Sequence, residues 1–166
     1  NSLIRQLNEQ LSEKEELLTV EETNELLNGE ASATHVEVIE TVISSLDQND
    51  SAMVSHRDGG HLWKFQYGSV EVFVQLTGET EEDTLAVWSS VLKLPVNDEA
   101  RLMRQLLEMN WSDTYETAFA LYNQEVVVLT HRTVADLSPV EISRAITLVA
   151  SIADDNDETL QAEFGK

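Results

Sequence analysis

The stretch Tyr115–Phe164, YETAFALYNQEVVVLTHRTVADLSPVEISRAITLVASIADDNDETLQAEF, decides the fold because its successive patterns agree with one another. From Tyr115 to Leu121 the larger side chains occupy every second position, which predicts a β-strand. Residues 126–129 read Val-Val-Val-Leu and predict a second strand with both faces buried. Only the polar pair Asn123-Gln124 separates them, so we expect an antiparallel hairpin.

A long helix should follow this hairpin. Ser138 can cap free backbone N–H groups, Pro139 suits the first helical position, and Glu141 can reach back to the cap. Apolar residues then recur at helical spacing and make one stripe, which the hairpin is well placed to bury: Ile142, Ala145, Ile146, Val149, Ile152 and Ala153.

Three more strands are predicted upstream, at residues 61–67, 70–77 and 84–93, because apolar side chains alternate there between short turns. Short connections favour an antiparallel meander. Helices are expected after Thr34 and from about Asn97. The predicted class is α+β, with a five-stranded antiparallel sheet in the order α-β-β-β-α-β-β-α.

Residues 1–30 are polar and helical in character, with few apolar positions per turn, so they cannot form a domain alone. We expect them to be an N-terminal helical arm, attached to an α+β domain over residues 31–166. The arm packs either on its own domain or on a partner, and the sequence leaves both alternatives open.

Thirty-one acidic residues against ten Lys and Arg give a formal charge of −21. This excess of acid argues against binding nucleic acids, whose phosphates require clustered basic residues, and against anionic membranes. A protein partner or a homodimer remains allowed. No cysteine is present, which excludes disulfides and thiol catalysis. No apolar run is long enough to span a membrane, and no secretory signal is visible, so we expect a cytoplasmic location.

No familiar catalytic motif occurs, so the expectation is a non-enzyme with no catalytic residues and no cofactor. The alternative is an enzyme or small-ligand binder with an unrecognised site, in which His56, Asp58, His61 and His131 would have to meet. A second alternative is a weak calcium or metal sensor that uses its acidic segments.

The segment Asp154–Glu158 resembles a calcium loop but departs from its pattern. Thr159 stands where the glycine of the turn is needed, and Gly165 stands at the place of the bidentate glutamate. We therefore expect no metal ligands here and interpret the segment as a polar kink in the last helix.

Four aromatic residues are the candidate partner-binding residues: Trp63, Phe65, Phe73 and Trp88. A sheet covered by helices on one face leaves its other face open, and apolar side chains on that face would mark an interface or groove. The alternative is that these aromatics belong to the ordinary core.

Several segments resemble the bacterial YbjN-like family, which shares the type III secretion chaperone-like fold. The similar segments are Leu92–Pro95, Leu107–Asn110, Phe119–Leu121, Glu125–Leu129, Leu137–Ile142 and Ala153–Gly165. The resemblance covers roughly residues 34–165. The additional N-terminal arm suggests a cyanobacterial subgroup of the family, whose members carry a similar arm. It implies a sensory, regulatory or chaperone-like role and supplies no active site. The expected function is a non-catalytic protein-binding module with an unknown client.

Overall fold

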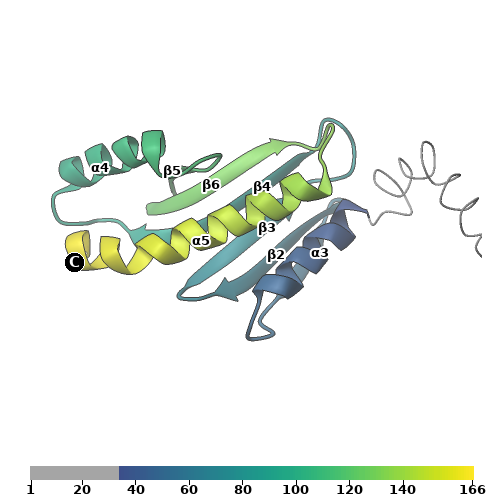
Figure 1. Ribbon diagram of the computed structural model, residues 1–166, viewed down its shortest axis with the longest axis horizontal. Coiled ribbons are helices and arrows are strands. Elements are labelled where there is room, and N and C mark those ends of the chain that lie inside the picture. Colours follow the sequence, from purple (N-terminus) through teal and green to yellow (C-terminus); the bar gives the residue numbers. More distant parts are fainter. Residues whose placement is uncertain (1–33) are drawn as a thin grey trace, which may run out of the picture. The chain divides into compact units, whose positions relative to one another are not determined.

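The computed structural model describes residues 34–166, which form one antiparallel sheet with helices on one of its faces (Figure 1). The elements are α3 (His35–Leu46), β1 (Met53–Arg57), β2 (Gly60–Tyr67), β3 (Val70–Leu76), β4 (Thr84–Lys93), α4 (Glu99–Ser112), β5 (Ala118–Tyr122), β6 (Glu125–Thr133) and α5 (Pro139–Phe164). The α+β class is confirmed. The arm predicted for residues 1–30 lies outside the described residues.

The sheet has six strands in the order β1-β2-β3-β4-β6-β5, so the prediction of five strands is wrong. The missed strand is β1, which pairs with β2 along one side only. All five of its residues are exposed. An exposed edge strand needs no alternation of apolar and polar side chains, and the sequence MVSHR accordingly shows none.

Cross-strand register sorts the side chains onto two faces. Phe65 lies opposite Val72, which lies opposite Ser89, which lies opposite Val128. Directly paired residues share a face, and neighbours along a strand alternate. We call the face that carries Phe65 the covered face, because the helices lie over it, and the other the open face.

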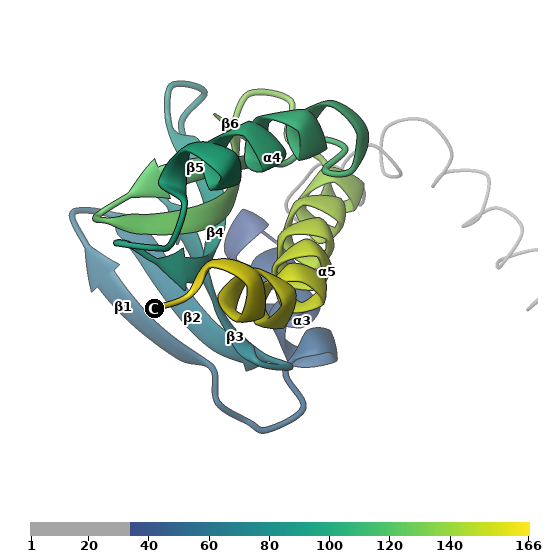
Figure 2. The same ribbon diagram turned by 90° about the vertical axis from the view of Figure 1, so that its left-hand side faces the viewer.

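The long helix α5 packs across β3, β4 and β6 on the covered face. Figure 2 shows α4 and α5 on the same side of the sheet. The apolar stripe of α5 is buried as predicted, with Ile142, Ile146 and Val149 fully inaccessible. Ile39 and Ile43 of α3 are also buried, whereas α4 runs beside the edge strand β5.

The helix starts follow the predicted capping chemistry with one shift. The Ser138 hydroxyl accepts a hydrogen bond from the Glu141 backbone N–H at 3.2 Å, which confirms the cap of α5. In α4 the capping residue is Asp98 rather than Asn97, and its carboxylate accepts from the Arg101 backbone N–H. The Asn97 side chain instead donates to the Gly165 carbonyl beside the end of α5.

The acidic segment, interpreted from the sequence as a polar kink, lies within the uninterrupted helix α5. Asp154 accepts hydrogen bonds from the backbone N–H and the hydroxyl of Ser69, at 2.9 and 3.0 Å. The same hydroxyl lies 2.8 Å from Asp157, whose side chain is buried. Gly68 permits this approach, because a Cβ there would lie 2.2 Å from the Asp154 carboxylate. These carboxylates therefore hold the β2–β3 turn against the helix.

Candidate functional site

Trp63 and Phe65 lie in the core of the domain. Their side chains are 2% and 1% exposed and point to the covered face. The sequence grouped them with Phe73 and Trp88 as candidate partner-binding residues, and the structure does not bring these four together. The reason is the two-residue turn at Gly68-Ser69, which pairs Phe65 with Val72 rather than with Phe73. The two buried aromatics are core residues and offer no surface to a partner.

Phe73 and Trp88 lie side by side on the open face. They are direct cross-strand partners on β3 and β4, and their rings stack with centroids 5.4 Å apart and planes 10° apart. Both side chains are half-buried. Their register row continues through Leu129 on β6 to Ala118 on β5, which makes an apolar band across four strands. Among residues 34–166, no helix lies over this band (Figures 1 and 2).

A shallow cavity of about 260 Å³ adjoins the Trp88 ring. It is lined by Gln75, Trp88, Ala120, Leu121, Tyr122, Val127 and Leu129. Val127 is buried and lies on the open face beside Ala120, whereas Tyr122 is exposed. An apolar cavity of this size, on an uncovered sheet face and bordered by the edge strand β5, can receive a large apolar side chain from a partner.

The open face carries little net charge. Its basic residues are Arg57, Lys64 and Lys93, and its acidic residues are Glu71 and Glu125. Three positive minus two negative charges give +1, in a chain whose total is −21. Two of these charges, Lys64 and Glu71, lie 3.9 Å apart and are about half exposed, so their attraction is weak. Contacts on this face are therefore governed mainly by apolar area.

A larger groove of about 900 Å³ begins at Phe73 and runs past Glu71, at the start of β3. It continues along Lys93 and Pro95 to the last residues, Gly165 and Lys166. The groove exists because β4 extends beyond its neighbour and its pairing with β6 shifts between Ser90 and Leu92. The groove therefore extends the accessible surface from the Phe73–Trp88 pair toward the C-terminal residues.

The histidines do not form a common site. The rings of His56 and His61 lie 4.5 Å apart, and His61 stacks on Trp63 at 5.1 Å. His131 lies on the open face, three strands away from His61, which faces the covered side. Adjacent strands are separated by about 4.8 Å, so this offset amounts to roughly 14 Å. The arrangement required for the enzyme alternative is therefore not formed.

Within residues 34–166, no three His, Asp or Glu side chains are grouped so that they could hold a metal ion. In the acidic segment of α5, Asp154 and Asp157 face the Ser69 hydroxyl and serve as structural acceptors. The described residues therefore supply no ligand set for the metal-sensor alternative.

A further cavity of about 360 Å³ lies between β6 and α5. Two ion pairs line it: Arg132 with Glu141, and Arg144 with Glu116. The hydrogen bond from the Arg144 guanidinium, 2.7 Å long, is the main cause that lowers the pKa of Glu116 below its ordinary value. Each of these four charged side chains therefore has a protein partner of opposite charge at the cavity.

The sequence reasoning missed two sets of residues: those that line the open-face cavity and those on the outer side of α4. Leu129, Val127 and Tyr122 of the cavity were interpreted as ordinary strand residues. Leu107 and Trp111 on α4 are also strongly exposed. A signal existed for the helix: its apolar positions, including Met103 and Leu107 beside Leu102 and Leu106, span more than one buried stripe needs.

In the part of the chain that the structure describes, no helix is both long enough and apolar enough to cross a membrane. A comparison with curated proteins gives no match. Among solved structures, the chain resembles one in a crystal structure of the ExsC–ExsE complex, with 15% identity and a TM-score of 0.48. That alignment covers 74% of this chain and 90% of the other. The family model for YbjN, described as "Putative bacterial sensory transduction regulator", matches residues 35–162. The chain therefore belongs to the YbjN family.

Proposed function

We propose that this chain is a non-catalytic protein-binding module, regulatory or chaperone-like in role, that receives an apolar segment of a partner protein on its open face. The observation that carries the proposal is the stacked Phe73–Trp88 pair beside an apolar cavity, on a sheet face that no described helix covers. Aromatic side chains around a cavity are typical anchors of protein interfaces. Membership of the YbjN family is consistent with a regulatory role.

The charge distribution supports the choice of this face. A chain of −21 repels phosphates and anionic lipids over most of its surface, so we propose neither a nucleic-acid nor a membrane partner. The open face is almost neutral, so the bound segment should be mainly apolar and its affinity should depend little on salt. A cytoplasmic location is part of the same proposal, and so is a cyanobacterial origin of the subgroup.

The domain organisation is also a proposal. The family model begins at residue 35, which supports a boundary near residue 31 between an N-terminal arm and the YbjN domain. The open face belongs entirely to the domain, so binding should persist in a chain that begins at residue 31. Loss of binding on removal of residues 1–30 would assign part of the recognition to the arm.

The test is photo-cross-linking in the native cell, with a photoreactive benzoylphenylalanine in place of Trp88. We expect a discrete cross-linked protein at this position, which a second substitution, Phe73→Ser, abolishes. The matched control places the same group at Val140, an exposed position on the first turn of α5. A probe at Val140 should give no such adduct.

Two outcomes would contradict the proposal. If the adduct at position 88 persists at equal yield with Phe73→Ser, the aromatic pair does not form the binding surface. If positions 88 and 140 label the same proteins, the contact is non-specific collision. Circular dichroism of each variant shows whether the fold is intact, since these open-face positions lie outside the core.

A further inference from the structure

Two histidines lie directly opposite each other at the edge of the sheet. His56 on β1 pairs with His61 on β2, and the two-residue turn Asp58-Gly59 joins the strands. Both turn residues have positive φ, 48° and 82°, as in the tight turns whose flanking residues form a hydrogen-bonded pair. Pair types alternate along antiparallel strands, so His56 and His61 form a non-hydrogen-bonded pair, the type whose side chains approach most closely.

The separation of the two rings matches that of two imidazoles on one metal ion. The ring centroids of His56 and His61 lie 4.5 Å apart, and the ring planes make an angle of 74°. Imidazole nitrogen binds zinc at about 2.0–2.1 Å. At this bond length, two imidazoles on one ion have ring centres roughly 4.5 Å apart at a right angle and roughly 5 Å apart at the tetrahedral angle. The backbone therefore already holds the two rings at chelating distance.

The surroundings hold one ring and leave the other able to turn. The ring of His61 stacks on the buried Trp63, with centroids 5.1 Å apart and planes 9° apart. His56 is exposed, so its ring can turn a nitrogen toward an ion without disturbing the core. No described residue forms a hydrogen bond or an ion pair with either imidazole. Within residues 34–166, the ring nitrogens of both histidines are therefore available to a metal.

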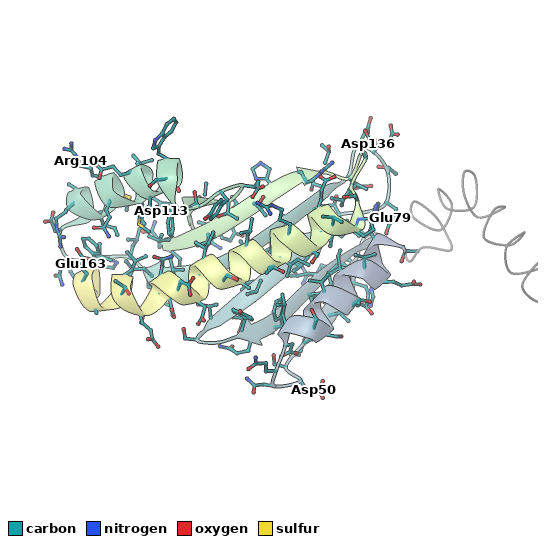
Figure 3. The ribbon with its side chains drawn as sticks, in the orientation of Figure 1. Asp50, Glu79, Arg104, Asp113, Asp136 and Glu163 are labelled. Carbon is teal, nitrogen blue, oxygen red and sulfur yellow. The ribbon has the colours of Figure 1, made fainter. Side chains whose placement is uncertain are left out.

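The ligand type and the charge of the chain indicate which ion binds. Imidazole nitrogen suits zinc and copper, whereas calcium and magnesium prefer oxygen ligands. A net charge of −21 attracts cations to the surface of the chain. Figure 3 shows the carboxylates of Asp50, Asp136 and Glu163 at separate ends of the domain. Among the described residues, no cluster of carboxylates therefore competes with the two histidines for the ion.

We propose that His56 and His61 together bind one divalent transition-metal ion of the zinc and copper class. The two imidazoles fill two coordination positions, and water fills the others in the isolated chain. The ion ties β1 to β2, the only strand with which β1 pairs in the described sheet. The site lies at the sheet edge, on the covered side, so this inference does not depend on the proposed function of the open face.

The test is isothermal titration of the untagged full chain with Zn²⁺ and, separately, with Ca²⁺. We expect one zinc ion to bind per chain and Ca²⁺ not to displace it. His56→Ala and His61→Ala should each weaken zinc binding about tenfold or more, because the second imidazole no longer binds at the high effective concentration of a chelate. The control His131→Ala removes an exposed histidine from the open face and should leave the affinity unchanged.

A second measurement locates the ion. Bound Cu²⁺ quenches the fluorescence of a nearby indole, and Trp63 stacks on His61. The substitutions Trp88→Phe and Trp111→Phe leave Trp63 as the single tryptophan of the chain. One equivalent of Cu²⁺ should then quench most of the remaining fluorescence, and a further His56→Ala should abolish this quenching. His56 is exposed on an edge strand, so its removal leaves the core intact, which circular dichroism verifies.

Three results would overturn the proposal. A chain that takes up no zinc in the titration has no such site. Zinc that binds equally well to wild type and to His56→Ala, or that Ca²⁺ displaces, is an adventitious ion held by surface carboxylates. Quenching of Trp63 by Cu²⁺ that persists after His56→Ala means that the ion lies elsewhere than between the two histidines.

Discussion

The two faces of this sheet are built from the same alternating strands, yet they meet different surroundings. On the covered face Phe65 contacts aliphatic neighbours under the helices and is 1% exposed. On the open face Phe73 stacks on Trp88 and is half-buried by its own sheet. Both faces are apolar, so apolarity by itself does not separate core from interface. What separates them is whether a helix lies over the strand.

The largest difference in stability should appear when a phenylalanine is replaced by alanine on each of the two faces. Phe65→Ala removes a fully buried ring and should lower the free energy of unfolding by about 3–5 kcal/mol. Phe73→Ala removes a ring that still contacts water and should cost roughly 1 kcal/mol. Urea denaturation followed by circular dichroism measures both values. Equal costs would show that the open face is packed as tightly as the core and would remove the contrast.

An intermediate loss of stability should follow a change in the turn that joins β2 to β3 and is hydrogen-bonded to α5. Ser69→Ala removes the hydroxyl that lies within hydrogen-bond distance of Asp154 and Asp157. Asp157 is 4% exposed and would lose its donor, so the free energy of unfolding should fall by about 1–3 kcal/mol. The measurement is the urea midpoint. The control Ser55→Ala, on the exposed strand β1, should leave that midpoint nearly unchanged.

The smallest effect should come from the loop between β3 and β4, which belongs to neither face. The Asp83 carboxylate accepts from the Thr80 hydroxyl and backbone N–H and from the Thr77 hydroxyl. The Thr80 hydroxyl bond is the leading cause that lowers the pKa of Asp83 in the folded chain. A lowered folded pKa stabilises the chain above the ordinary carboxyl value, about 3.9, and that contribution is lost as pH falls below it.

Asp83→Asn therefore should reduce stability slightly at neutral pH and make little difference in acid. Thermal unfolding from neutral pH down to about pH 3 compares the two chains. A gap in Tm that widens as the pH falls would mean that the charged carboxylate does not stabilise the folded loop.

Much of the architecture was predictable because burial leaves a periodic trace in the sequence. The strands β2, β3 and β4, the hairpin β5–β6 and the cap at Ser138 all follow from alternation or spacing. The strand β1 left no such trace because its residues are exposed. The acidic run of α5 accepts hydrogen bonds from Ser69, more than eighty positions earlier in the chain, and the local sequence carries no trace of this long-range partner.

The candidate site was half predictable. Phe73 and Trp88 were identified as aromatic residues that a partner could bind, and the turn alone could have shown that Trp63 and Phe65 lie on the opposite face from them. A two-residue turn at Gly68-Ser69 forces Tyr67 opposite Val70 and hence Phe65 opposite Val72. The alternation of side chains does not show which face of the sheet the helices cover, because both faces are apolar. The apolar outer side of α4 was recognised only from the observed exposure of Trp111.

The exposed edge strand β1 has a consequence for aggregation. Without it, the edge of the sheet would be β2, an eight-residue strand whose free backbone groups could pair with other chains. β1 pairs with β2 and replaces that edge with five residues that include a histidine and an arginine. Such a short edge, with a charged residue at its end, is a poor template for a further strand. β1 thus contributes little to the core, yet it protects the sheet from uncontrolled growth.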